Sequence, residues 1–251
     1  AYHNRRMSMV KVLSEYILSL GQEAYIPNFF CKAYRPVLYI PSREEVKELL
    51  QKMDIRTSHN SEQFRLDREC KILFLLYFCC GLRLSEGRLL KWEHIDLDKG
   101  ILTVLGSKGN KDRLVYLPQD SLPVLKNYKE RQEMLFPGID WAFPGKDPHK
   151  PVSCSGVESS FNRHWAMLPV ARTVDKHPTP HCLRHAYVVE RFNEWMHQGI
   201  DTNTMLPYLS RYLGHKSPDE TYYYYHLVEK AFDTIREKDS VSGKVRSEEH
   251  T

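Results

Sequence analysis

A chain of 251 residues with a 41% share of apolar residues can hold one large domain, or one domain and a fragment of another. Its 36 basic and 32 acidic side chains leave a formal charge of +4, which by itself does not demand a nucleic-acid partner. The six cysteines form no C-x-x-C pair, which argues against a zinc ribbon or a disulfide framework and favours a reducing, cytosolic setting. No secretory signal is visible, and the longest apolar run, residues 72–82, is too short to span a bilayer.

The first 35 residues are expected to form one helix followed by a linker. Apolar residues recur at helical spacing from Met9 to Leu20, and Gly21 then breaks the pattern. Pro27 and Pro36 favour an extended segment beyond it. Because the chain begins inside the predicted helix, we expect it to be a fragment of a longer protein.

The main domain is expected to begin with a capping box, in which Ser42 is the N-cap and Glu45 follows three residues later. The helix that it starts has one apolar face, made of Val46, Leu49, Leu50 and Met53. A longer helix from about residue 62 to 80 is nearly apolar all round in its second half, which predicts a buried central helix. Gly81 is a suitable residue to end it.

Arg83 comes directly after this predicted stop. Ser85 is expected to cap a further helix that carries Leu89 and Leu90. An arginine between two helix ends is held by backbone on both sides, although a single arginine is more often an ordinary surface residue.

Beyond residue 95 the apolar period changes from helix to strand. Strands are predicted at residues 95–97, 101–105 and 113–117, and residues 106–112 form a glycine-rich, lysine-bearing hairpin tip. A helix over residues 121–135, a second helix through Val157, Phe161 and Trp165, and a short helix over residues 202–212 follow. The basic residues near the second of these helices are consistent with phosphate contacts or with a solvated face; they are Arg163, His164, Arg172, Lys176 and His177.

The segment 180–187 combines polar and apolar residues at the start of a predicted helix. Its His181 and Arg184 are three residues apart and therefore share one helix face, so that an acid/base group and a fork of donors point at the same place. Alone the pattern is weak, because a buried helix start can carry a capping histidine and a surface arginine. Further along the chain lie Leu213-Gly214-His215 and a run of four tyrosines, residues 222–225, before His226.

Taken in chain order, these motifs resemble those of the tyrosine recombinase (phage integrase) family over roughly residues 36–240. The motifs are Gly81-Leu82-Arg83-Leu84-Ser85-Glu86, the lysine hairpin, His181-x-x-Arg184-His185, Leu213-Gly214-His215 and Tyr224-x-His226. The resemblance implies an α+β, mainly helical fold with a small three-stranded antiparallel sheet. It also implies that residues 1–35 are the last helix and linker of an N-terminal core-binding domain, residues 36–240 a catalytic domain, and residues 241–251 a flexible tail.

The resemblance further implies a role for each motif. Tyr224 would attack a DNA phosphodiester, giving a 3′-phosphotyrosine and a free 5′-hydroxyl. His181 is the nearest candidate to take the proton of the phenol. Arg83, Arg184 and His215 would stabilise charge on the non-bridging oxygens, and Lys108 would protonate the leaving oxygen. Glu86 and His185 are expected to orient these catalytic groups.

Two of these assignments leave alternatives open. Counting nine residues on from His215 and requiring a Tyr-x-His ending selects Tyr224, with Tyr223 and Tyr225 as alternatives. In the hairpin, aligned on the Gly-Lys-Gly-Asn-Lys pattern of the family, Lys108 is the match, but Ser107 is an extra residue directly before it, so that Lys111 rivals Lys108. A departure elsewhere is Gly87, where the family usually has a larger apolar residue; it is expected to cost helix stability.

No cofactor and no metal is implied. The expected partners are double-stranded DNA recombination sites, further copies of the chain in a tetramer on two sites, and accessory DNA-bending proteins. A helix over residues 228–238 is expected to dock on the neighbouring copy. The expected setting is the bacterial cytoplasm, at the nucleoid, in the service of a mobile element.

Three alternative functions belong to other classes: a type IB topoisomerase-like enzyme, a non-catalytic DNA-binding relative, and a metal-binding module built on the twelve histidines. The His-x-x-Arg-His box and the helix after Tyr224 argue against the first. The completeness of the motif set argues against the second. The third is disfavoured because the histidines are scattered, with no metal-ligand spacing.

Overall fold

The computed structural model describes residues 2–28, 39–55, 59–107, 111–174, 177–215 and 217–224. The chain divides into two compact units, residues 1–38 and 39–251. The first unit contains α1 (Tyr2–Ser19), which Gly21 follows at a positive φ of 76°, so the predicted N-terminal helix is confirmed. In the described ranges, no helix has both the length and the apolarity needed to cross a membrane.

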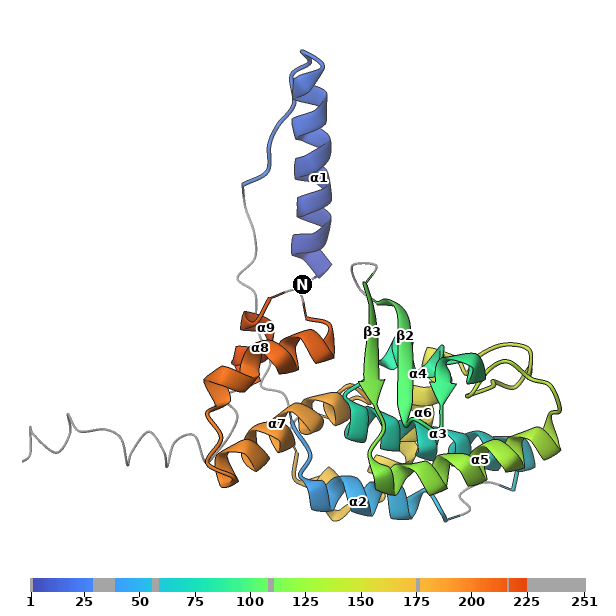
Figure 1. Cartoon of the computed structure of the whole chain (residues 1–251). Coiled ribbons are helices and arrows are strands. Elements are labelled where there is room, and N and C mark those ends of the chain that lie inside the picture. Colours follow the sequence, from blue (N-terminus) through green and yellow to red (C-terminus); the bar gives the residue numbers. More distant parts are fainter. Residues whose placement is uncertain are drawn as a thin grey trace, which may run out of the picture. The chain divides into compact units, whose positions relative to one another are not determined.

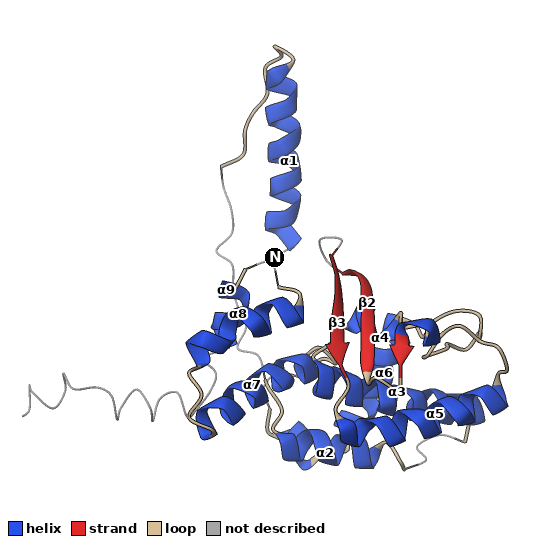
Figure 2. Ribbon diagram, in the orientation of Figure 1, coloured by secondary structure: helices blue, strands red, loops and turns tan. Residues whose placement is uncertain are grey.

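The second unit is mainly helical, with one small sheet (Figures 1 and 2). Its elements are α2 (Arg43–Lys52), α3 (Ser61–Cys80), α4 (Leu84–Arg88), η1 (Trp92–His94), β1 (Ile95–Asp96), β2 (Ile101–Ser107), β3 (Lys111–Tyr116), η2 (Gln119–Ser121), α5 (Leu122–Leu135), α6 (Cys154–Trp165), η3 (Pro169–Arg172), α7 (Cys182–His197), α8 (Thr202–Leu213) and α9 (Asp219–Tyr222). The three strands pair antiparallel in the order β1-β2-β3. This is the fold class that the sequence predicts.

Helix α3 is the buried centre of this unit, as predicted. The side chain of Asn60 caps its first turn by accepting from the N–H groups of Glu62 and Gln63. The helix packs against α6 and α7, and its second half buries Leu73, Phe74, Leu76, Tyr77 and Cys80, with the residues between them partly buried. Gly81 ends it at a φ of +62°, and a Cβ there would lie 2.6 Å from the ring of Tyr187, so both backbone and packing require glycine.

The predicted capping box at the start of α2 is also confirmed. The hydroxyl of Ser42 accepts from the N–H of Glu45 at 3.2 Å, and the carboxylate of Glu45 accepts from the N–H of Ser42 at 2.8 Å. The helix buries Val46 and Leu49, and its C-cap residue Met53 is buried with them in the core of the domain.

Helix α4 begins earlier and is shorter than the sequence predicts. Arg83, not Ser85, is its N-cap residue, and the carboxylate of Glu86 accepts from the N–H of Arg83 at 2.7 Å. The helix ends at Arg88, so that Leu89 and Leu90 lie outside it. The predicted start at Ser85 was wrong. The carboxylate of Glu86 reaches back three residues and accepts from the N–H of Arg83, so the helix begins there without a cap from the Ser85 hydroxyl.

The extra residue in the hairpin is accommodated within a strand. Val104 pairs with Arg113, and Ser107 pairs with Lys111. Between these two pairs β2 advances by three residues and β3 by two, so β2 contains a β-bulge. Within the bulge Gly106 has a φ of +55°, and its N–H donates to the Asp112 carboxylate at 2.9 Å. Both strands are therefore longer than predicted. Lys108 itself lies outside the described residues.

The two basic residues in the last turn of α6 make contacts within the domain. His164 is fully buried, and its Nδ1 lies 2.8 Å from the carbonyl oxygen of Ser160. Arg163 forms an ion pair at 2.8 Å with the buried carboxylate of Asp67 on α3. The ion pair of Arg163 joins α6 to α3, whereas the contact of His164 lies within α6. The burial of His164 excludes both of the readings left open for it, a phosphate contact and a solvated face.

Gly87 packs directly against α3, and this contact makes a stability prediction. A Cβ at this position would lie 2.5 Å from Tyr77 and 2.8 Å from Leu73, and the Tyr77 ring is held by a 2.8 Å bond from its hydroxyl to the Leu84 oxygen. We expect Gly87→Ala to lower the free energy of unfolding by about 1–3 kcal/mol, because overpacking outweighs the gain in helix propensity.

Chemical denaturation measures this effect. The matched control is Ser85→Ala on the exposed side of the same helix, where the expected change is within about 0.5 kcal/mol. Unchanged stability of Gly87→Ala would mean that the α3–α4 contact is loose.

Candidate active site

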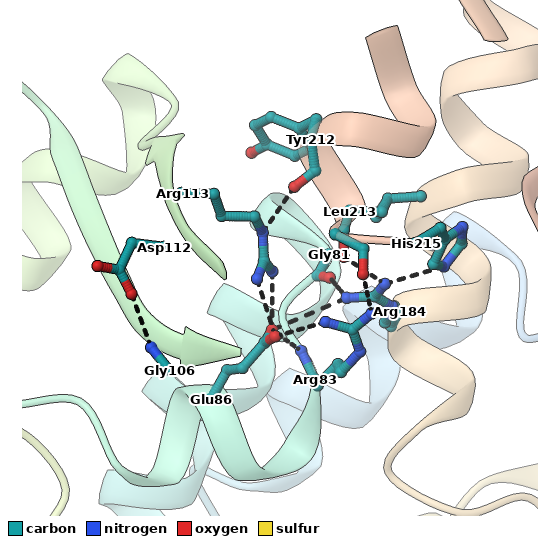
Figure 3. Close-up of polar contacts among 11 residues, drawn as sticks. Gly81, Arg83, Glu86, Gly106, Asp112, Arg113, Arg184, Tyr212, Leu213 and His215 are labelled. Carbon is teal, nitrogen blue, oxygen red and sulfur yellow. Dashed lines mark hydrogen bonds and ion pairs between the residues drawn. The ribbon is translucent and has the colours of Figure 1, made fainter. Parts of the chain in front are cut away.

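The carboxylate of Glu86 lies at the centre of a cluster of three arginines (Figure 3). Its side chain is only 5% exposed. Arg83 donates to it from its backbone N–H and from Nη1, each at 2.7 Å, and Arg113 donates from both Nη atoms at 2.8 Å. The Nη1 of Arg184 lies 3.9 Å away. Burial alone would raise the pKa of Glu86, but the bonds and charges of Arg113 and Arg83 lower it to about 2.

The same three arginines also bind three consecutive main-chain carbonyls at the C-terminal end of α8. The pairs are Arg113 Nε with the Tyr212 oxygen at 2.7 Å, Arg184 Nη2 with the Leu213 oxygen at 2.8 Å, and Arg83 Nη2 with the Gly214 oxygen. The last carbonyls of a helix lack intrahelical partners and carry partial negative charge. The arginines therefore cap α8, and Gly214, at a φ of +67°, turns the chain toward His215.

Arg184 joins the end of α3 to the end of α8. Its Nη1 donates to the carbonyl oxygen of Gly81 at 2.6 Å, and the side chain is 2% exposed. Burial and the nearby charge of Arg83 lower the pKa of Arg184 to about 10, so the guanidinium stays charged at neutral pH.

His215 comes directly after Gly214 in the chain and accepts a hydrogen bond from Arg184. Its Nε2 lies 3.0 Å from Nη2 of Arg184, and its Nδ1 lies 2.6 Å from the hydroxyl of Thr221. Because a guanidinium only donates, Nε2 accepts and Nδ1 carries the proton toward Thr221. Burial, followed by the charges of Arg184 and Arg83, lowers the pKa of His215 to about 3.

Of the tyrosines at 222–224, the part of the run that the structure describes, Tyr224 is the buried one. Its side chain is 5% exposed and packs beside Tyr187 and Leu213, whereas Tyr223 is 37% exposed. The hydroxyl of Tyr224 lies 2.5 Å from Nδ1 of His185. Burial raises the pKa of Tyr224 to about 12, although the charge of Arg184 opposes this rise. The rival Tyr225 and the motif residue His226 lie outside the described residues.

His185, rather than His181, is the histidine that contacts the tyrosine. His181 stands exposed at the N-terminus of α7, and its ring meets the ring of His185 edge-on, with centroids 4.5 Å apart. Partial desolvation and the charges of Arg184 and Arg83 lower the pKa of His181 to about 4. The expectation that His181 is nearest to the nucleophile is therefore wrong for this structure: Tyr224 packs one turn further along α7.

Arg113 is a member of this cluster that sequence reasoning missed. A usable signal was present, since Arg113 lies two residues before Val115, and alternate residues of a strand share a face. Val115 is buried in the core, so the same alternation directs Arg113 inward. An arginine on the inner face of a strand needs a buried anion, and Glu86 is that anion.

The comparisons with known proteins agree on one family. A family model described as "Phage integrase family" matches residues 42–231. Tyrosine recombinase XerC of Alcanivorax borkumensis is 29% identical over 225 residues, which cover 89% of this chain and 68% of XerC. Tyrosine recombinase XerA of Pyrococcus furiosus is 32% identical over 162 residues, covering 64% of this chain and 51% of XerA. The chain thus spans between about half and two thirds of these relatives.

Solved structures share the fold. The XerH site-specific recombinase bound to a palindromic difH substrate matches with a TM-score of 0.67 and 22% identity, over 92% of this chain and 62% of that chain. A lambda integrase dimer bound to a COC′ core site matches with a TM-score of 0.62 and 18% identity, over 88% and 71%. At these identities the likeness concerns the fold.

The buried histidines predict that stability falls on acidification. The pKa of His185 is lowered to about 3, first by burial and then by the charges of His181 and Arg184, against about 6.5 in an unfolded chain. The folded state therefore binds fewer protons than the unfolded state between these values, so stability present above about pH 6.5 is lost as the pH falls.

We expect His185→Asn to have a lower free energy of unfolding than wild type at pH 7. Between pH 6.5 and 5, however, its free energy of unfolding should fall by less than that of wild type, the difference being up to about 2 kcal/mol. Urea unfolding at a series of pH values measures the slope. Equal slopes for the two proteins would mean that His185 titrates normally in the folded state.

Proposed function

The chain belongs to the phage integrase family of tyrosine recombinases, which cut and rejoin DNA, and from that premise we propose a mechanism and a biological role for it. It acts as a site-specific recombinase of a mobile element, through a 3′-phosphotyrosine intermediate on Tyr224. Support comes from one juxtaposition: His185, the histidine bonded to the buried hydroxyl of Tyr224, lies on helix α7 beside the buried guanidinium of Arg184.

In the cleavage step, Oη of Tyr224 forms a bond to phosphorus and the bond from phosphorus to the 5′ oxygen breaks. The link conserves the energy of the phosphodiester, so that a 5′-hydroxyl of a second strand can attack it and release the tyrosine. The leaving 5′ oxygen receives a proton from a lysine of the β2–β3 hairpin, Lys108 or Lys111.

The proton of the phenol passes to His185. Its ring is neutral near pH 7 because burial lowers its pKa to about 3, and its Nδ1 lies at hydrogen-bond distance from the hydroxyl. His181, edge-on to His185 and exposed, is placed to exchange protons with solvent.

Arg83 and Arg184 stabilise charge on the non-bridging oxygens, and His215 holds Arg184 in place by accepting a hydrogen bond from it. Guanidinium groups match phosphate with planar forks. Both are already held by Glu86 and by main-chain carbonyls, so they do not reorganise as charge develops. A preorganised donor is typically worth ~10²–10³ in rate.

Double-stranded recombination sites are the proposed substrate, with four copies of the chain on two sites. The XerH and lambda integrase structures each contain such DNA, and the latter is a dimer on its core site. Residues 1–35, which include α1, are proposed to belong to an N-terminal core-binding domain. The helix expected at residues 228–238, which would dock on a neighbouring copy, lies outside the described residues. Accessory DNA-bending proteins complete the proposed assembly.

Tyr224→Phe is expected to abolish covalent attachment to DNA while DNA binding stays within about twofold, because only the nucleophilic oxygen is lost. Nicked duplexes taken from the genomic flanks of the gene serve as substrates, and the adduct is detected by denaturing electrophoresis. The matched control is Tyr223→Phe, which removes an exposed hydroxyl and keeps the adduct. Peptide mapping of the DNA to Tyr223 or Tyr225 would contradict the assignment.

A sulfur-substituted substrate identifies the lysine that protonates the leaving oxygen. An alkoxide leaving group has a conjugate acid of pKa ~15.7 by analogy with water, whereas a thiolate has ~8.5 by analogy with cysteine and departs without a proton. We expect Lys108→Ala to be ~10²–10⁴-fold slower on ordinary DNA but close to wild type on a 5′-bridging phosphorothiolate. Arg184→Ala, which acts on non-bridging oxygens, gains no such rescue.

Rescue of Lys111→Ala instead would assign the proton to Lys111. If sulfur rescues neither variant, the hairpin lysines only contact phosphate and the proton comes from another group.

A further inference from the structure

Arg113 joins three elements of the site through one side chain. It projects from β3, is 9% exposed, and uses all three of its nitrogens (Figure 3). The two Nη atoms donate to the two oxygens of Glu86 on α4, and Nε donates to the carbonyl oxygen of Tyr212 on α8. None of the roles assigned above uses this residue.

We propose that Arg113 is a positioning residue for DNA cleavage, acting through Glu86 and the end of α8 on Arg83 and Arg184. The inference rests on the proposed function of the site. Arg113 does not itself contact the scissile phosphate; it fixes the groups that do.

The first path runs through the carboxylate. Arg113 forms the bidentate pair with Glu86, whereas Arg83 reaches it with one nitrogen of its side chain and Arg184 lies at 3.9 Å. The hydrogen bond and charge of Arg113 are the largest influences that lower the pKa of Glu86. Without Arg113, the carboxylate loses its planar partner and draws Arg83 toward itself, away from the phosphate.

The second path runs through the end of α8. Arg113, Arg184 and Arg83 bind the carbonyls of residues 212, 213 and 214 in that order. Removing Arg113 loosens the end of α8, whose next two carbonyls hold the side chains of Arg184 and Arg83 in position. A misplacement of about 1 Å in a catalytic group can cost 10²-fold in rate. A second contact between β3 and α8 remains, since the rings of Tyr116 and Tyr212 lie 5.8 Å apart, so the helix stays docked.

A buried arginine can also serve stability alone, and the charge of the substrate separates the two roles. A methylphosphonate at the scissile position carries no negative charge, so its cleavage needs less stabilisation from guanidinium groups. A defect transmitted through Arg83 and Arg184 therefore shrinks on this substrate. A defect that arises from lost folding is the same on both substrates.

The test compares Arg113→Lys, which keeps the charge but not the planar fork, with wild type. The matched control is Arg65→Ala, because Arg65 is a 17% exposed arginine that likewise binds a buried carboxylate, Glu69, and a main-chain carbonyl, Gly145. Single-turnover adduct formation is measured on phosphate and methylphosphonate duplexes, at a temperature where thermal unfolding shows each protein to be folded.

We expect Arg113→Lys to be about 10-fold to 100-fold slower than wild type on the phosphate, and within about threefold of it on the methylphosphonate. Arg65→Ala should keep the wild-type rate on both. Glu86→Gln, which removes the charge through which Arg113 acts, should show the same substrate dependence, and it replaces Arg113→Lys if that variant does not fold.

A wild-type rate for Arg113→Lys, or an equal loss on both substrates, would overturn the inference while leaving the proposed function intact. Absence of any adduct with the wild-type protein would overturn the proposed function and the inference together.

Discussion

The buried carboxylate of Glu86 is the interaction on which the site depends. Three guanidinium groups, those of Arg83, Arg113 and Arg184, surround one anion, an arrangement that would repel itself without further negative charge. The carbonyl end of α8 supplies that charge, since each arginine also donates to it. Strand β3 and helices α4, α7 and α8 are thereby tied at one point. The positive excess that remains suits a phosphodiester, which brings its own negative charge.

Much of this fold could be predicted because its causes are local. The capping box at Ser42, the stop of α3 at Gly81 and the three strands each follow from a few neighbouring residues. The family resemblance carried by the motifs also implied that Arg83 and Arg184 act together, and the structure places both around one carboxylate. In the structure these motifs lie at the ends of packed helices, and Arg184 bonds to carbonyls at two of those ends, Gly81 and Leu213.

The remainder depends on long-range packing that no short window contains. Helix α4 starts at Arg83 because Glu86 is fixed partly by Arg113, 27 residues further along the chain. The contact between His185 and Tyr224 depends on how the chain after α8 folds back onto α7, which spacing alone does not define. Helical spacing put His181 and Arg184 on one helix face, yet the histidine that meets the tyrosine is His185, one turn beyond the N-cap residue His181.

The acceptors that anchor the arginines at α8 are main-chain oxygens, and every amino acid supplies one. Substitutions at Tyr212 or Leu213 change packing but leave the carbonyls in place. Alanine scanning therefore detects only the donor half of this network, the arginine side chains, because it does not remove the main-chain oxygens that accept from them. Sequence drift along the last turn of α8 is tolerated by the same token, provided that Gly214 keeps the helix ending where it does.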